Sequence, residues 1–266
     1  MRGKPGFTGK LSAELERGAV TYARYRAWLI SDIFQWPFWT IFFFLSILMY
    51  SPASLSNSAV VKSMAYSFFA FIFVSSFLWS SASLVSEAQQ GIIEQLILAK
   101  TSLRNHLVGR AVITAADIAV GGTVLLLLSM LVFGVDVSVA MPLHFAASIA
   151  VASVFFLLFS AVVSALMLSV KSPWMVVSML QFIIPFSSGA LPMQLLPPQT
   201  AQIIALNPLF YVVHPLVASA TGAFYFPAET IFTVALASTA AMALIAVYAE
   251  KQLIQRALKK GRLTLF

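Results

Sequence analysis

Long apolar runs with almost no charge most constrain how this chain can fold. The run 143–170 contains no Asp, Glu, Lys or Arg, and the run 110–133 contains only Arg110 and Asp117. Only 9% of the 266 residues are charged, whereas soluble domains carry roughly 25%. A soluble fold of this length could not enclose so much apolar surface, so we expect the chain to lie in a lipid bilayer.

The apolar runs predict an all-α membrane protein with a transmembrane domain over residues 29–250. A helix needs about 20 residues to cross a bilayer; five runs reach that length and a sixth is shorter. The six transmembrane helices are expected at 28–50, 61–85, 110–133, 143–170, 174–186 and 229–249. The fifth is short for a bilayer, and a broken apolar segment follows it.

That broken segment, 187–222, is apolar but interrupted by glycine and proline. The interrupting residues are Gly189, Pro192, Pro197, Pro198, Pro208 and Pro215. Irregular backbone at membrane depth is tolerated only where protein or a water-filled cavity covers it. We therefore expect two short re-entrant or interfacial helices, at 199–206 and 211–219, with Asn207 and Pro208 in the turn between them.

The charged segments predict the orientation of the chain. Apolar side chains from Leu11 to Leu29 recur at 4-3-4-3-4 spacing, so residues 1–28 are expected to form an amphipathic helix along the membrane interface. Residues 251–266 form a basic cytoplasmic tail. With six spans, fifteen of the sixteen Lys and Arg residues fall on one side and Lys62 alone on the other. The positive-inside rule then places both termini in the cytoplasm of a multi-pass protein.

A polar segment, 86–110, separates the second and third spans and holds a large share of the few charges. Ser86 and Gln89 have the spacing of a capping box, which predicts that a helix starts there. Thr101 or Ser102 can cap a second helix that leads into the third span. A helix that is connected to two spans in this way can transmit a movement of a soluble partner to both of them.

Two stretches carry a family resemblance. The first comprises Glu87, Gly91, Ile93, Glu94, Gln95 and Leu96, followed by Ser102, Gly109 and Arg110; the second is SGALPMQLLPPQTAQIIALNPLFYVV. Both resemble motifs of the type-2 ABC exporter permeases, the membrane halves of transporters for polysaccharides, lipids and drugs. The layout of the spans also matches, so the resemblance covers nearly the whole chain. Ile92 stands where that family usually has Thr, and Lys100-Thr101 stand where a Pro often precedes the Ser.

The resemblance implies that two such chains pair, as a homodimer or with a similar partner, in the cytoplasmic membrane of a prokaryote. Each would dock one copy of a separate ATP-hydrolysing subunit, which binds ATP and Mg. Residues 86–105 would be the coupling helix that docks there. Its implied contact residues are Glu87, Gly91, Glu94, Gln95, Leu96 and Arg104. The chain has no GxxxxGK[ST] phosphate loop, so we do not expect it to be an enzyme on its own.

Two further groups of residues are candidates for the path of a substrate. A stripe on the second span lies in line with Glu87: Ser76, Ser80 and Ser83, with Phe77 beside them. Small hydroxyl residues also permit close helix packing or bond back to helix carbonyls, so either role is open. By resemblance, Gly189, Pro192, Asn207 and Pro208 would form an exit gate; structural plugging is the alternative.

The remaining polar residues indicate no metal or catalytic site. His106, His144 and His214 lack metal-ligand spacing, and the chain contains no cysteine. Asp32 and Asp117 lie within apolar runs, but near the cytoplasmic end, where an interfacial salt bridge is favoured over a proton relay.

Other classes of protein remain as alternatives. A secondary, ion-coupled transporter would be expected to show internal repeats and acids at mid-membrane. An intramembrane enzyme would need a cluster of His, Asp or Glu. We find neither pattern in the sequence, nor a basic patch with exposed aromatics that would indicate nucleic acid. Membrane lipids are the expected surroundings.

Overall fold

The computed structural model describes residues 7–24, 30–31, 34–36, 38–42, 44–45, 57–92, 95, 103–167 and 173–260. This part of the chain is helical and contains no strand. Its elements are α1 (Phe7–Arg24), α3 (Ser58–Gln89), α5 (Leu103–Phe133), α6 (Pro142–Met167), α7 (Pro173–Ser187), the 3₁₀ turn η2 (Met193–Leu195), α8 (Pro198–Ala205), α9 (Phe210–Thr221) and α10 (Ala228–Lys260).

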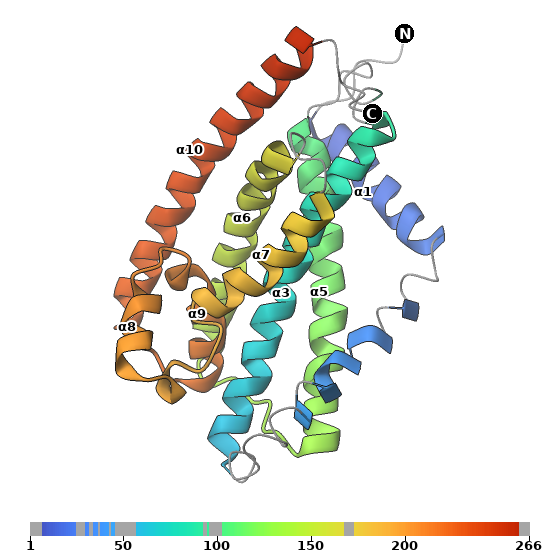
Figure 1. Ribbon diagram of the computed structural model, residues 1–266. Helices are drawn as coiled ribbons and strands as arrows, with labels where there is room; N and C mark the ends of the chain where they lie inside the picture. The colour runs from blue at the N-terminus through green and yellow to red at the C-terminus, as the bar shows by residue number, and fades with distance from the viewer. Residues whose placement is uncertain are drawn as a thin grey trace.

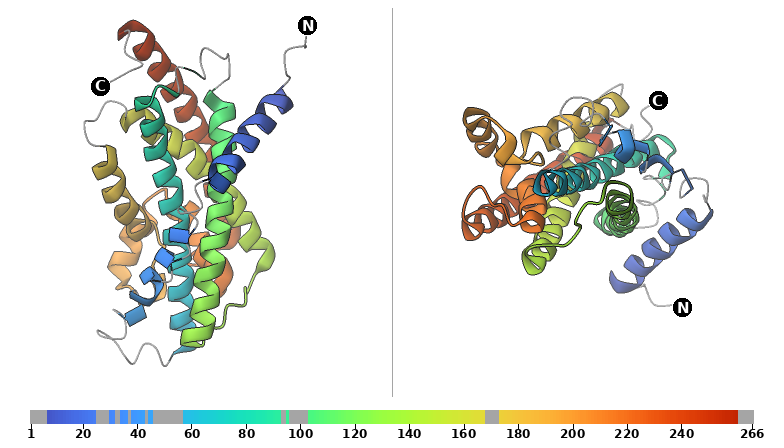
Figure 2. Two further views of the ribbon diagram at one scale, coloured as in Figure 1. Left: turned by 90° about the vertical axis from the view of Figure 1, so that its right-hand side faces the viewer. Right: turned by 90° about the horizontal axis from the view of Figure 1, so that it is seen from below.

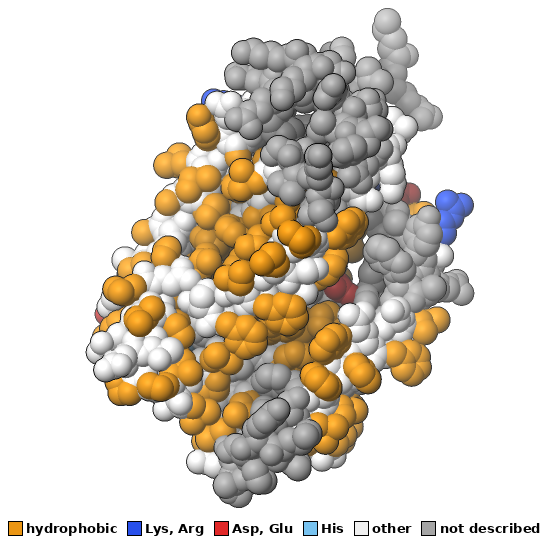
Figure 3. Space-filling view, in the orientation of Figure 1, with side chains coloured by type: hydrophobic (Ala, Val, Ile, Leu, Met, Phe, Trp, Pro, Cys, Tyr) orange, Lys and Arg blue, Asp and Glu red, His pale blue; other side chains and the backbone are white. Residues whose placement is uncertain are grey.

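Four of these helices are long and apolar enough to cross a membrane: α3, α5, α6 and α10. They coincide with the second, third, fourth and sixth predicted spans. The helix at the fifth, α7, has 15 residues. The first predicted span is described only in part, and its described residues 30–31, 34–36, 38–42 and 44–45 are helical. Apolar side chains cover much of the face seen in Figure 3, and exposed ones include Leu131, Leu143 and Leu244. The protein is therefore membrane-embedded by composition and shape.

The long helices form a bundle around α3, which packs against α5, α6, α7 and α9 (Figure 1). Its core is rich in aromatic side chains, including the fully enclosed Tyr66 and Phe73. Serines of α6 allow close approach to α3, because the Ser160 hydroxyl donates to the carbonyl of Phe77 at 2.8 Å. α1 and the C-terminal end of α10 lie toward the same end of the bundle, and α1 lies beside α5 (Figure 2).

The short helices α8 and α9 lie where the two helices of the broken segment were expected. In α9, ten of twelve residues are buried, because the helix is packed among α3, α6 and α10. Its C-terminal cap is Gly222, whose φ of 79° is left-handed and suits glycine. The backbone N–H groups of Ala140 and Met141 donate to carbonyls of Ser219 and Ala220, which fixes the end of α9 to the α5–α6 loop.

Two helix boundaries differ from those predicted. Ser86 does not cap a new helix: α3 continues through it to Gln89, and the N–H of Gln90 still donates to the Ser86 carbonyl at 3.0 Å. The helix continues because its last turns pack against α5, and it stops at Gly91, whose φ is 73°. At the C-terminus, α10 runs without a break from Ala228 to Lys260, so the predicted tail begins as part of that helix.

Candidate functional site: a pocket between α3, α5 and α7

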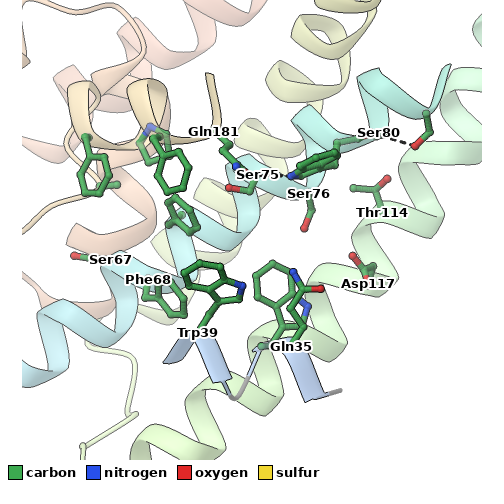
Figure 4. A pocket seen from close by; sticks show the side chains of 18 of the residues that line it. Gln35, Trp39, Ser67, Phe68, Ser75, Ser76, Ser80, Thr114, Asp117 and Gln181 are labelled. Carbon is green, nitrogen blue, oxygen red and sulfur yellow. Dashed lines mark hydrogen bonds between the residues drawn. The ribbon is translucent and has the colours of Figure 1, made fainter. Parts of the chain in front are cut away.

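A pocket of about 880 Å³ opens between α3, α5, α7 and residues 31–42. The predicted stripe of Ser76, Ser80 and Ser83 lies in its wall. Figure 4 shows Ser76 from α3 facing Thr114 and Asp117 from α5 across this space. Three of the four candidate pathway residues thus share one cavity.

The fourth candidate, Phe77, does not line this pocket. It is 2% exposed and packs against Phe73 and Phe156 in the core between α3 and α6. The physical reason is helical geometry. Phe77 follows Ser76 by one residue, or about 100° around the helix, and that turn directs its ring toward α6 instead of the pocket.

Aromatic side chains line much of the pocket wall. Phe71 of α3 lies 5.6 Å from Phe182 and 6.5 Å from Phe186 of α7, measured between ring centroids. Trp79 lies 5.8 Å from Trp174 and donates its indole N–H to Gln181 at 2.8 Å. These contacts join α3 to α7 along the length of α7, so the two helices form a continuous aromatic wall.

Four buried polar atoms in the described part of the chain have no hydrogen-bond partner: Trp36 Nε1, Ser75 Oγ, Ser76 Oγ and Arg110 Nε. All four residues line the pocket. Trp36 reaches this position because α5 has Gly121 there, where a Cβ would lie 2.9 Å from the indole nitrogen. Sequence analysis missed Trp36 and Ser75; the Gly121-Gly122 pair within an apolar run was the available signal of a close approach.

At the C-terminal end of α3, a polar network joins α1, α3 and α5. The Glu87 carboxylate accepts from Arg110 Nη1 at 2.6 Å and pairs with His106 Nε2 at 2.7 Å. His106 is fully buried, and its Nδ1 lies 2.9 Å from Arg17 Nη2. Since a guanidinium only donates, Nδ1 accepts from Arg17, and Nε2 carries the proton that bonds Glu87. We name these four residues the inner network.

The opposite end of α3 is tied by groups with more access to solvent. Lys62 Nζ donates to Asp136 Oδ2 at 2.8 Å and to the Ser138 hydroxyl at 2.9 Å. The Lys62 ammonium, with the backbone N–H and hydroxyl of Ser138, holds the pKa of Asp136 well below its usual range. The buried Tyr66 hydroxyl donates to the Val137 carbonyl at 2.6 Å. Lys62, the one cation predicted on this side, is thus paired with an acid.

The predicted gate residues lie together in the connection between α7 and α9. Asn207 donates to the Ser187 carbonyl at 2.9 Å and accepts from the N–H of Leu209 at 3.0 Å, so it joins the end of α7 to the start of α9. Pro192 precedes η2, and Pro208 follows Asn207 in the turn before α9. At Gly189, whose φ is 75°, a Cβ would lie 2.6 Å from the ring of Phe210.

His214, to which the sequence analysis gave no role, has a partner on each ring nitrogen. Its Nε2 accepts from the backbone N–H of Tyr225 at 3.2 Å, so Nδ1 carries the proton and faces the Gly189 carbonyl at 3.3 Å. Its ring stacks on Phe210 at 4.6 Å. These contacts are those of a structural histidine that holds the broken segment together.

The residues expected to contact a motor subunit are only partly visible. Glu87 is engaged within the chain, Gly91 follows the end of α3, and Gln95 is exposed. Glu94 and Leu96 lie outside the described residues, and of Arg104 only the backbone, in α5, is described. Of the two acids within apolar runs, Asp117 lines the pocket, while Asp32 is outside the described part.

Comparison with known proteins identifies no relative, since neither a protein-family model nor a curated protein matches the chain. The geometry of the pocket and the polar segment beside it must therefore carry the functional argument.

Proposed function

We propose that the chain is the membrane-spanning permease subunit of an ATP-driven exporter of the type-2 ABC class. A separate subunit would hydrolyse ATP and dock on residues 86–105 from the cytoplasm. Two permease chains, as a homodimer or with a similar partner, would move an amphipathic, lipid-linked, polysaccharide or drug-like substrate outward across the cytoplasmic membrane. Both chain termini would be cytoplasmic.

One observation supports this proposal most directly. α3 enters the polar segment and α5 leaves it, and these same two helices form opposing walls of the pocket. The Glu87–Arg110 ion pair joins the two helices where the polar segment begins and ends. A force applied to residues 86–105 would therefore reach both walls at once, which is the coupling that an external motor requires.

The test is copurification of the full chain with the ATP-binding subunit encoded beside it, followed by measurement of ATP turnover. We expect a stable complex that hydrolyses ATP, and we expect Glu94→Arg to weaken both docking and turnover because it reverses a charge at a polar interface. Glu229→Arg is the matched control, since Glu229 is an exposed acid in the first turn of α10. Absence of any complex, with both variants equal to the parent, would contradict the proposal.

A secondary, ion-coupled transporter is the second candidate, and the position of Asp117 in the pocket wall favours it. In that case transport would follow an ion gradient without nucleotide, and Asp117→Asn would abolish the dependence on that gradient. Transport in sealed vesicles that contain ATP but no gradient separates the two mechanisms.

A further inference from the structure

We infer that the pocket binds an uncharged amphiphile of drug-like size, whose head carries hydrogen-bond acceptor oxygens and whose body is apolar. Describing this ligand as the exported substrate rests on the proposed function. Binding itself depends only on the pocket described above.

The unpaired polar atoms define what the head must offer. Arg110 Nε can only donate, and the hydroxyls of Ser75 and Ser76 can donate as well. Trp36 Nε1 lies apart from them, against Gly121 and beside the Gly122 that contacts Phe69, in the apolar half of the pocket. Ser75 is 97% buried, as its exposed fraction is 3%. Buried donors are normally satisfied, because an unmade hydrogen bond is costly. Three such donors, on residues that line the half of the cavity from Ser75 to Arg110, indicate an occupant that supplies acceptor oxygens.

The charges of the wall indicate an occupant without net charge. Among the described residues that line the pocket, Arg110 and Asp117 are the charged ones, and they are opposite in sign. The Arg110 guanidinium is already paired with Glu87 at 2.6 Å. An anionic head would meet Asp117, a cationic head would meet Arg110, and either charge would lose its hydration against aromatic walls.

The lengthwise distribution of side chains sets the orientation of the ligand. From Ser83 to Phe68 the wall of α3 extends about 22 Å at 1.5 Å per residue. The hydroxyls of Ser80 and Ser83 lie in the half nearer Arg110, whereas Phe68 and Phe71 face Phe182 and Phe186 of α7 in the other half. The head thus lies toward residues 86–105, and the apolar body lies toward the end of α7.

The volume of the pocket limits the size of the ligand. Pockets that enclose drug-sized molecules span roughly 300–1,000 Å³, and this pocket has about 880 Å³. It can enclose one small amphiphile, but a polysaccharide would extend far beyond it. Among the substrate classes that the proposed function includes, the pocket therefore favours a small glycosylated or carbonyl-rich amphiphile over a polymer.

The test is photolabelling of the full chain in lipid nanodiscs with a dodecyl glucoside that carries a diazirine in its tail. The glucoside has an uncharged, acceptor-rich head, and dodecyl phosphate and dodecyltrimethylammonium serve as competitors with the same tail but a charged head. We expect saturable labelling of the peptides around Phe71 and Phe182. Unlabelled dodecyl glucoside should compete at least about 10-fold better than either charged analogue, which corresponds to about 1.4 kcal/mol.

Serine variants test the role of the hydroxyls. Ser75→Ala and Ser76→Ala should each weaken binding about 2- to 10-fold, the worth of one neutral hydrogen bond, and Ser76→Thr should restore it because the hydroxyl is kept. Ser81→Ala is the matched control: Ser81 lies on the same helix, is buried, is not part of the pocket wall, and its hydroxyl donates to the Phe77 carbonyl at 3.4 Å. It should bind as the parent does.

Three results would overturn the inference: better competition by a charged analogue, parental binding by both alanine variants, or labelling spread evenly over lipid-facing helices. The labelling needs neither ATP nor the motor subunit. If no motor subunit docks, the proposed function fails while saturable, serine-dependent labelling still supports the ligand class. If ATP turnover is coupled normally but labelling is unspecific, the ligand class fails and the proposed function stands.

Discussion

The two ends of α3 are held by similar chemical groups in opposite surroundings. At the inner network, Glu87 binds His106 and Arg110, and the His106 side chain is fully buried. At the other end, Lys62 binds Asp136, whose side chain is 60% exposed. Buried charges depend on their partners, whereas water competes at an exposed pair. We therefore expect the ion pairs of Glu87 to stabilise their helix contacts more than the Lys62–Asp136 pair does.

The difference also bears on how the pocket is held. The inner network joins α1, α3 and α5 next to the polar segment, through one defined tautomer of His106. At the Lys62 end, Tyr66 is fully buried and bonds a loop carbonyl. Three substitutions test this contrast, in order of decreasing effect.

The largest effect is expected for Glu87→Gln. The substitution keeps the size of the side chain but removes the charge that compensates Arg110, and we expect the chain to lose about 3 kcal/mol of stability. Thermal unfolding of the purified chain in detergent, followed by circular dichroism, measures the loss. Glu229→Gln is the control, because Glu229 is exposed. Equal melting of the two variants would show that burial of Glu87 has no energetic consequence.

An intermediate effect is expected for Tyr66→Phe. The ring remains in the core, but the 2.6 Å hydrogen bond to the Val137 carbonyl is lost, at a cost of about 1 kcal/mol. Tyr248→Phe is a matched control, since the Tyr248 hydroxyl is on an exposed side chain and accepts from Gln252 within α10. The same melting experiment applies, and a Tyr66 variant as stable as the Tyr248 variant would refute the contribution of this bond.

The smallest effect is expected at Asp136. A carboxyl whose pKa is lowered in the folded state contributes stability above its ordinary pKa, near 4, and that contribution is lost as the pH falls. Because Asp136 is exposed, Asp136→Asn should change stability little at neutral pH and should only flatten its decline in acid. Unfolding midpoints at a series of pH values measure this. A loss as large as that of Glu87→Gln would remove the contrast between the two ends.

The features that depend on local composition could be predicted from sequence. Uninterrupted apolar runs predicted the four long helices, and the prolines and glycine after α7 predicted the breaks around α8 and α9. It was harder to predict which side of α3 packs against which neighbour, since a helix that is apolar on nearly all sides has no marked polar face to orient it. Ser76 was assigned to the pocket side with its neighbour Phe77, and only the packing of α6 separates the two.

Features that depend on distant partners could not be predicted. His106 bonds Arg17 across 89 residues of chain, and no local sequence pattern predicts that hydrogen bond. The Ser86 capping box failed for the same reason, since packing against α5 keeps α3 helical beyond it. The unpaired Trp36 indole depends on Gly121 of another helix.

The enclosure of α9 has a consequence for biosynthesis. Its 12 residues extend about 18 Å, less than the roughly 30 Å of the hydrocarbon core, so the helix cannot be held in a bilayer as an independent span. It needs neighbours already inserted. Two of them, α3 and α6, precede it in the chain and leave the ribosome first, and α10 follows to enclose it. The order of synthesis therefore provides the binding groove for α9 before α9 itself emerges.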